Sequence, residues 1–143
     1  MEESPDIFYV VARQEFDFLV SDYGFRPRPF VPTSFPASSV DYDSPAVQIS
    51  PVWDRGEVTV GIWVNVDTLW IRPASPRSFS LLELLQLVAP SVLGELPGCG
   101  QAEFSGASLR PPLAFYATQL RRYAESLLRG DVSLCENILI SRG

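Results

Sequence analysis

The sequence holds few side chains that could catalyse a reaction, and the clearest pair is Asp41 and Asp43. On one strand, residues two apart project from the same face roughly 7 Å from each other. Two carboxyl groups at that separation suit the acid and base of an inverting glycosidase. No neighbouring residue would make one of them the acid and the other the base. We therefore interpret both as solvated strand residues and expect no catalysis from them.

Two residue types that carry much enzyme chemistry are absent from the 143 residues. There is no histidine and no lysine, and all 11 basic residues are arginine. Ser-His and Cys-His nucleophile pairs, Schiff-base formation and a P-loop lysine are thereby excluded. The two cysteines, Cys99 and Cys135, lie far apart and cannot form a zinc site alone, so we interpret them as free thiols in the core. We predict a protein that is not an enzyme and uses no metal and no cofactor.

The formal net charge is −6, which disfavours binding to nucleic acid or to anionic membranes and favours a basic protein partner. The same charge could serve solubility alone. No apolar run reaches the roughly 18 residues of a membrane span. The chain starts MEESPD, acidic where a secretion signal is basic, so we expect a cytoplasmic protein. Its length and 46% hydrophobic content are typical of one globular domain over residues 1–143.

The spacing of apolar and turn-forming residues predicts helices over residues 5–22, 81–88 and 111–128. Ser80 and Glu83 form a capping box at the start of the second. The proline-rich stretch 27–36 predicts an edge segment or a loop, and the glycine-rich stretch 94–108 a loop. Residues 132–140 could form a last helical turn or an added strand. Apolar and polar residues alternate in four further segments, which predicts strands over 40–43, 47–53, 57–64 and 69–72.

The turns between these strands fix one pairing register. An Arg55–Gly56 turn pairs Trp53 with Val58, a tight Ser44–Pro45 turn pairs Tyr42 with Val47, and a loop over 65–68 pairs Val64 with Leu69. All three place apolar side chains on one face, whereas a one-residue slip would turn a strand over. We therefore predict an α+β fold: an N-terminal helix, an antiparallel meander of four or more strands, then two helices packed on one sheet face.

The same register predicts what lies on the opposite face. One row across the sheet reads Asp41, Gln48, Trp63 and Trp70, and the next reads Ser39, Ser50, Gly61 and Arg72. Two neighbouring tryptophans beside an arginine are typical of protein-binding hot spots. We hypothesise that this face binds a partner. Alternatively, another segment covers the face and the tryptophans are core residues. The residues of the predicted partner site are Trp63, Trp70, Arg72, Asp41 and Gln48.

Several segments resemble small bacterial proteins, some of which are immunity proteins for polymorphic toxins. The resemblance rests on Phe16 to Phe25, on Val40 to Ser44, on Phe79-Ser80-Leu81 and on Tyr123 to Asp131. It implies a stoichiometric binder that occludes a toxin, and it assigns no binding residue. Two other functions stay open. One is an assembly module that forms a homodimer, and the other is a small-ligand-binding domain or hydrolase with Asp41 in a deep pocket.

Overall fold

The computed structural model describes residues 6–28, 37–54, 57–64, 78–95, 106–131 and 133, which form an α+β fold. The helices are α1 (Asp6–Phe16), α2 (Phe18–Tyr23), α3 (Leu81–Val88), the 3-10 helix η1 (Pro90–Glu95), α4 (Gly106–Tyr123) and α5 (Glu125–Leu128). The strands are β1 (Arg26–Pro27), β2 (Ala37–Ser39), β3 (Tyr42–Asp43), β4 (Val47–Asp54), β5 (Glu57–Val64) and β6 (Ser78–Ser80).

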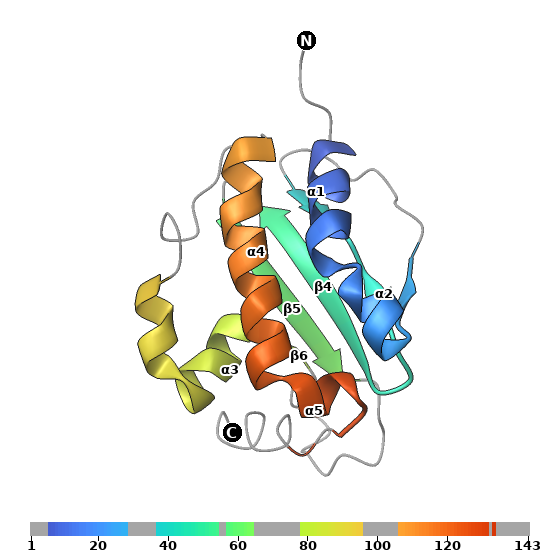
Figure 1. Ribbon diagram of the computed structural model, residues 1–143, viewed down its shortest axis with the longest axis vertical. Coiled ribbons are helices and arrows are strands. Elements are labelled where there is room, and N and C mark those ends of the chain that lie inside the picture. The colour runs from blue at the N-terminus through green and yellow to red at the C-terminus, as the bar shows by residue number, and fades with distance from the viewer. Residues whose placement is uncertain are drawn as a thin grey trace.

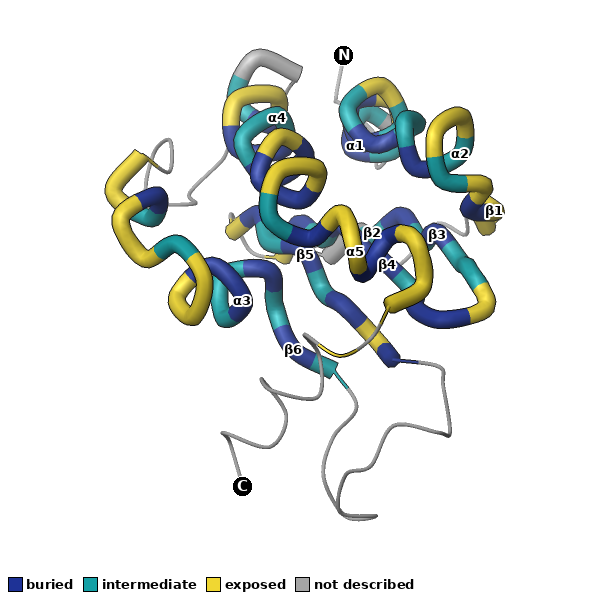
Figure 2. Tube along the Cα trace, turned by 60° about the horizontal axis from the view of Figure 1, so that its bottom comes forward, coloured by how far each residue is buried: buried dark blue, intermediate teal, exposed yellow. Residues whose placement is uncertain are grey.

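The strands form one antiparallel sheet in the order β1-β3-β4-β5-β6, and β2 pairs with β4 beside β3. Helices α1 and α4 pack on each other and cross the same face of the sheet (Figure 1). Seen from the end, α1, α2, α4 and α5 lie on one side of the strands (Figure 2). The predicted fold class, with an N-terminal helix, an antiparallel sheet and later helices on one sheet face, is confirmed. No described helix is long and apolar enough to cross a membrane.

The hydrophobic core lies between the helical layer and the apolar face of the sheet. Helix α1 contributes residues spaced for one helical face, and the two central strands contribute alternate residues. The fully buried residues of α1 and these strands include Phe8, Phe16, Ile49 and Ile62, and α4 adds Tyr116. The predicted first helix is interrupted at Asp17, a turn residue that accepts hydrogen bonds from Arg13. Gly24 then ends α2 in the left-handed conformation, with φ of 73°.

The β4–β5 hairpin has the predicted register. Trp53 pairs with Val58, Ile49 with Ile62 and Val47 with Val64, and all six side chains are buried. Pro51 lies within β4, but its carbonyl oxygen faces the other neighbouring strand, where it accepts from the Val40 N–H at 3.0 Å. The missing N–H of Pro51 therefore weakens only the pairing of β4 with β2 and β3, and it leaves the β4–β5 hairpin intact.

The predicted register between β3 and β4 is wrong by two residues. Tyr42 pairs with Ile49 and not with Val47, because the turn runs from Ser44 to Val47 with Pro45 as its second residue. The Ser44 N–H donates to the Val47 carbonyl at 2.9 Å, and the Ser44 hydroxyl oxygen accepts from the Val47 N–H at 3.1 Å. Serine first and proline second is the sequence that a type I turn favours. A shift of two residues leaves every side chain on its predicted face.

The predicted partner of β5 is also wrong. Strand β6 occupies the free edge of β5, where Trp63 pairs with Ser78, Ile62 with Phe79 and Gly61 with Ser80. Serines therefore stand beside Trp63 and Gly61, where the sequence predicted Trp70 and Arg72, and the predicted strand over 69–72 lies outside the described residues. Phe79 is buried, and Ser80 directly caps α3 through the predicted capping box. Trp70 and Arg72 lie outside the described residues.

Helix α4 begins five residues before the predicted position, inside the predicted loop. Pro111 and Pro112 consequently lie within the helix and not at its start. The reason is packing: Leu109 is fully buried and extends the apolar stripe of Leu113, Tyr116 and Leu120 by one turn. The predicted continuation to residue 128 is present as the separate short helix α5. Of the predicted 132–140 element, only Ser133 is among the described residues.

Candidate functional site

The sheet face that points away from α1 and α4 carries a polar row with one large aromatic residue. Asp43 pairs with Gln48, Gln48 with Trp63, and Trp63 with Ser78, so the four are successive cross-strand neighbours from β3, β4, β5 and β6. We call these four residues the Trp63 row. Neighbours of this kind in an antiparallel sheet lie close enough for their side chains to interact.

Trp63 is the exposed member of the row. Its side chain is 50% exposed, whereas Trp53, on the opposite face of the same hairpin, is 5% exposed. The alternation of β5 explains the difference, since Val58, Val60, Ile62 and Val64 take the buried positions and leave Trp63 on the other side. The predicted orientation of Trp63 is therefore correct, and core packing does not account for this indole.

Two of the predicted site residues are brought together and one is displaced. Gln48 and Trp63 are direct cross-strand neighbours, as predicted. Asp41 is not the neighbour of Gln48, because the two-residue shift of the turn gives that place to Asp43. Asp41 lies two residues earlier, where its carbonyl accepts from the Arg28 N–H at 2.8 Å. Ser44 and Pro45 suit the first two positions of a turn, and this preference could have identified Asp43 as the neighbour of Gln48.

The Gln48 amide has a defined orientation beside the indole. Its Nε2 donates to the Ser50 hydroxyl at 3.0 Å, which turns Oε1 away from Ser50. Next to Trp63 on the same face, Gly61 leaves open space. A Cβ atom there would meet only the Ser50 carbonyl oxygen, at 3.8 Å. Ser50 itself is buried, whereas Gly61 and Gln48 are partly exposed, so these two residues form the accessible surface beside Trp63.

An ion pair borders the row at the β1 side. Arg28 donates from Nε to Oδ2 of Asp43, and this contact raises the pKa of the guanidinium above its ordinary value. Arg28 comes from the proline-rich region and meets Asp43 only through the pairing of β1 with β3. The sequence analysis treated Asp43 only as a solvated strand residue and did not name Arg28, since alternation alone fixed neither the pairing of the edge segment nor the position of the turn.

Charges are distributed unequally between the two layers. The described side chains of α1, α2, α4, α5 and the turn after α5 include five arginines and five carboxylates. Four ion pairs join eight of these ten groups. They are Arg13–Asp17, Arg110–Glu15, Arg121–Asp22 and Arg129–Glu125. The described charges on the Trp63 side of strands β1 to β5 are two arginines against four carboxylates. These are Arg26, Arg28, Asp41, Asp43, Asp54 and Glu57.

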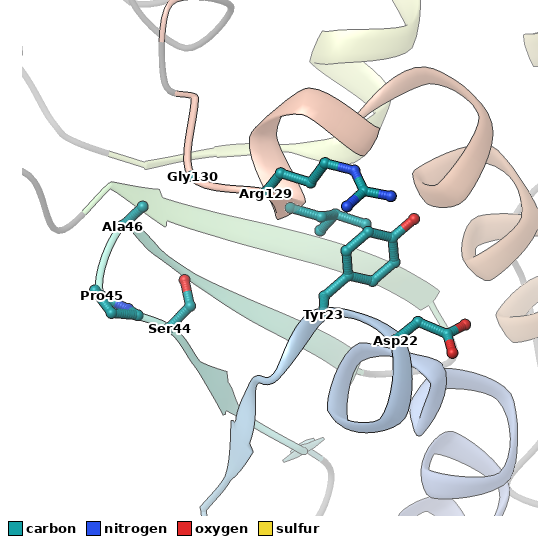
Figure 3. Close-up of a pocket in the computed structure, with 8 residues that line it drawn as sticks. Asp22, Tyr23, Ser44, Pro45, Ala46, Arg129 and Gly130 are labelled. Atoms are coloured by element: carbon teal, nitrogen blue, oxygen red, sulfur yellow. The ribbon is translucent and has the colours of Figure 1, made fainter.

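A cleft of about 560 Å³ lies at one end of the molecule, between the end of α2, the β3–β4 turn and the end of α5 (Figure 3). Its lining residues are Asp22, Tyr23, Ser44, Pro45, Ala46, Leu128, Arg129 and Gly130. The Arg129 guanidinium lies over the Tyr23 ring, 5.3 Å from its centroid. The Tyr23 hydroxyl donates to Glu125 at 3.0 Å, and partial burial together with this bond raises the pKa of Tyr23.

The polar groups of this cleft already bind one another. Asp22 is paired with Arg121 and Arg129 with Glu125, so the charges at the rim are neutralised. Asp41 is not among the residues that line this cleft. The cleft joins α2 to α5 through these contacts, and it offers a ligand mainly the apolar surface of Pro45, Ala46 and Leu128.

Within the described part of the chain, no three Cys, Asp or Glu side chains are grouped so that they could hold a metal ion. No protein-family model, curated protein or solved structure matches this chain.

Proposed function

We propose that this chain is a non-enzymatic protein-binding domain that binds a basic protein partner through the Trp63 row. The observation that carries the proposal is the half-exposed Trp63 side chain on the sheet face opposite the helices. Burying an indole stabilises a folded chain, yet Trp63 is half exposed although the core on the other face of the sheet is intact. Exposure of the largest apolar side chain among polar neighbours is typical of a contact that a partner completes.

The surroundings of Trp63 support a protein partner. Gln48 and Ser78 on either side are polar and neutral, and open space lies above Gly61. A central aromatic residue within a polar rim is the usual anatomy of a protein interface. The cleft of about 560 Å³ lies elsewhere, at the ends of α2 and α5.

The charge distribution supports a basic partner. Among the described residues, four carboxylates stand against two arginines on the Trp63 side of strands β1 to β5, whereas four ion pairs join most of the charges of α1, α2, α4, α5 and the turns beside them. Together with a net charge of −6, this favours a partner that carries basic groups. Complementary charge accelerates encounter and suppresses wrong partners.

The resemblance to toxin immunity proteins suggests which kind of partner this is. We propose that the chain occludes a toxin in a one-to-one complex. The candidate to test first is the protein encoded by the gene next to its own, since immunity proteins and their toxins are made as pairs.

The test compares Trp63→Ser with Val10→Ser. Val10 is 46% exposed on α1, on the helical side, and is the matched control. Affinity for the purified product of the adjacent gene is measured by calorimetry. Trp63→Ser should weaken binding by about 30-fold or more, as expected for a hot-spot residue, while Val10→Ser stays within about twofold. The melting temperature of Trp63→Ser should stay within a few degrees of the unsubstituted chain.

Three results would overturn the proposal. Equal affinity of Trp63→Ser and the unsubstituted chain would remove the Trp63 row as the binding surface. Absence of binding at micromolar concentration would remove the toxin partner. A dimer by light scattering that Trp63→Ser converts to a monomer would assign the row to a second copy of this chain.

A further inference from the structure

Three of the four residues in the Trp63 row carry a group that can interact favourably with a cation. Asp43 offers a carboxylate, Gln48 an amide oxygen and Trp63 the negative face of an indole. The amide is fixed in the accepting orientation, because its NH₂ group donates to Ser50. Among the described residues, no donor reaches the Gln48 Oε1 atom.

Elsewhere in the molecule, aromatic rings are already in contact with arginine side chains. Arginine side chains lie over aromatic rings at four places on the helical side. The pairs are Arg13 over Tyr9, Arg121 over Phe18, Arg122 over Tyr123 and Arg129 over Tyr23, with distances of 4.6 to 5.8 Å to the ring centroids. Trp63 has no such arginine among the described residues. The carboxylate at the end of the row, Asp43, already holds the guanidinium of Arg28.

We propose that the partner presents an arginine side chain to this row, with its guanidinium stacked on the Trp63 indole and donating to Oε1 of Gln48. The open space at Gly61 receives the aliphatic part of that side chain. This inference rests on the proposed function and specifies the chemistry that the same surface recognises. A planar guanidinium suits the row better than an ammonium group, since it stacks on a ring and donates in its own plane at once.

A first experiment uses the complex with the adjacent gene product and separates cation recognition from simple apolar burial. Trp63→Phe keeps an aromatic face, and Trp63→Leu keeps apolar surface without one. Affinity should fall by about 10-fold for Phe and by about 30-fold or more for Leu. Gln48→Glu should retain or tighten binding, because a carboxylate accepts from the cation and from the Ser50 hydroxyl, while Gln48→Leu should weaken it by about 10-fold.

A second experiment uses a defined probe and needs no natural partner. A tri-arginine peptide with blocked termini is titrated into the protein, and the indole N–H signals are followed by NMR, with Trp63→Leu identifying the signal of Trp63. The signal should shift with the arginine peptide and not with the tri-citrulline peptide, which has the same shape without the charge. Equal shifts with both peptides, or none at several millimolar, would overturn the inference.

The two proposals fail in distinguishable ways. If Trp63→Ser abolishes partner binding and Trp63→Leu restores it to the level of Trp63→Phe, the Trp63 row binds the partner through an apolar anchor. The proposed function then stands and the arginine inference is wrong. If Trp63→Ser leaves partner binding unchanged, both are wrong.

Discussion

Two buried tyrosines should respond in opposite directions to the same substitution. Tyr42 and Tyr116 are both fully buried in the shared core. The Tyr42 hydroxyl donates to Oδ1 of Asp17 at 3.1 Å. The Tyr116 hydroxyl has no hydrogen-bond partner among the residues that the structure describes. Replacing each by phenylalanine removes one oxygen atom and leaves the ring, so the two variants differ mainly in whether a hydrogen bond is lost.

The expected magnitudes follow from these contacts. A hydrogen bond to a charged group contributes about 1.5–3 kcal/mol, but the Asp17 side chain is 48% exposed and also binds Arg13, so solvent reduces this. Tyr42→Phe should therefore cost about 1 kcal/mol. A buried hydroxyl without a partner costs about 1–3 kcal/mol, so Tyr116→Phe should stabilise the protein by about 1 kcal/mol. The free energies of unfolding of the two variants should differ by about 2 kcal/mol.

Urea unfolding measures this difference directly, provided that the slopes of the two transitions agree. In a chain of this size the same difference corresponds to roughly 6–8 °C in melting temperature. Equal destabilisation by the two substitutions would refute the reasoning, because it would mean that the Tyr116 hydroxyl has a partner of its own. An internal water bound to both Tyr116 and Gln119, whose Oε1 is also buried without a partner, would give that result.

Three further outcomes are expected. Pro111 is exposed inside α4, so Pro111→Ala should restore a helical hydrogen bond and raise the melting temperature by about 3–8 °C, whereas a lower melting temperature would mean that the helix begins at residue 111. Ser80→Ala should remove the capping bond to the Glu83 N–H and cost about 1 kcal/mol by urea unfolding; an unchanged midpoint would contradict it. Burial raises the pKa of Tyr116 to about 12 and that of Tyr42 further, against about 10 in the unfolded chain, so the contribution of these two tyrosines to stability should be constant well below pH 10 and fall as the pH rises through 10, where the unfolded chain alone releases protons. The variant with phenylalanine at both positions should lose most of this fall in midpoint-against-pH measurements, and an equally steep fall would show that other groups cause it.

The parts of the fold that sequence alone could predict are those with local signals that agree. The Ser80–Glu83 capping box and the apolar spacing after it fix α3 to the residue. The Arg55–Gly56 turn and the alternation on both sides of it fix the register of β4 and β5. In each case the residues that decide the structure lie within one turn of the residues that adopt it.

The parts of the fold that were predicted wrongly depend on competition between distant segments. Residues 69–72 and β6 both alternate apolar and polar residues, and the free edge of β5 has room for one of them. Strand β6 is only three residues long, which gives a weak pattern, yet it buries Phe79 and leads directly into α3. Docking the whole of α3 onto the sheet stabilises this arrangement. The residue pattern within a single strand does not reveal that tertiary effect.

The candidate site shows which kind of error matters for function. The two-residue shift at the Ser44 turn keeps every side chain on its face, so the exposure of Trp63 was predictable although one of its predicted neighbours was wrong. The shift nevertheless changes the chemistry of the row, because it replaces Asp41 by Asp43 and brings Arg28 with it. The charge asymmetry was not predictable at all. A net charge of −6 does not say which carboxylates pair with arginines, and that depends on contacts such as Arg110–Glu15, whose residues lie 95 positions apart. A partner-binding face can thus be located from alternation, whereas the chemistry of the partner it accepts follows only from the pairing of distant residues.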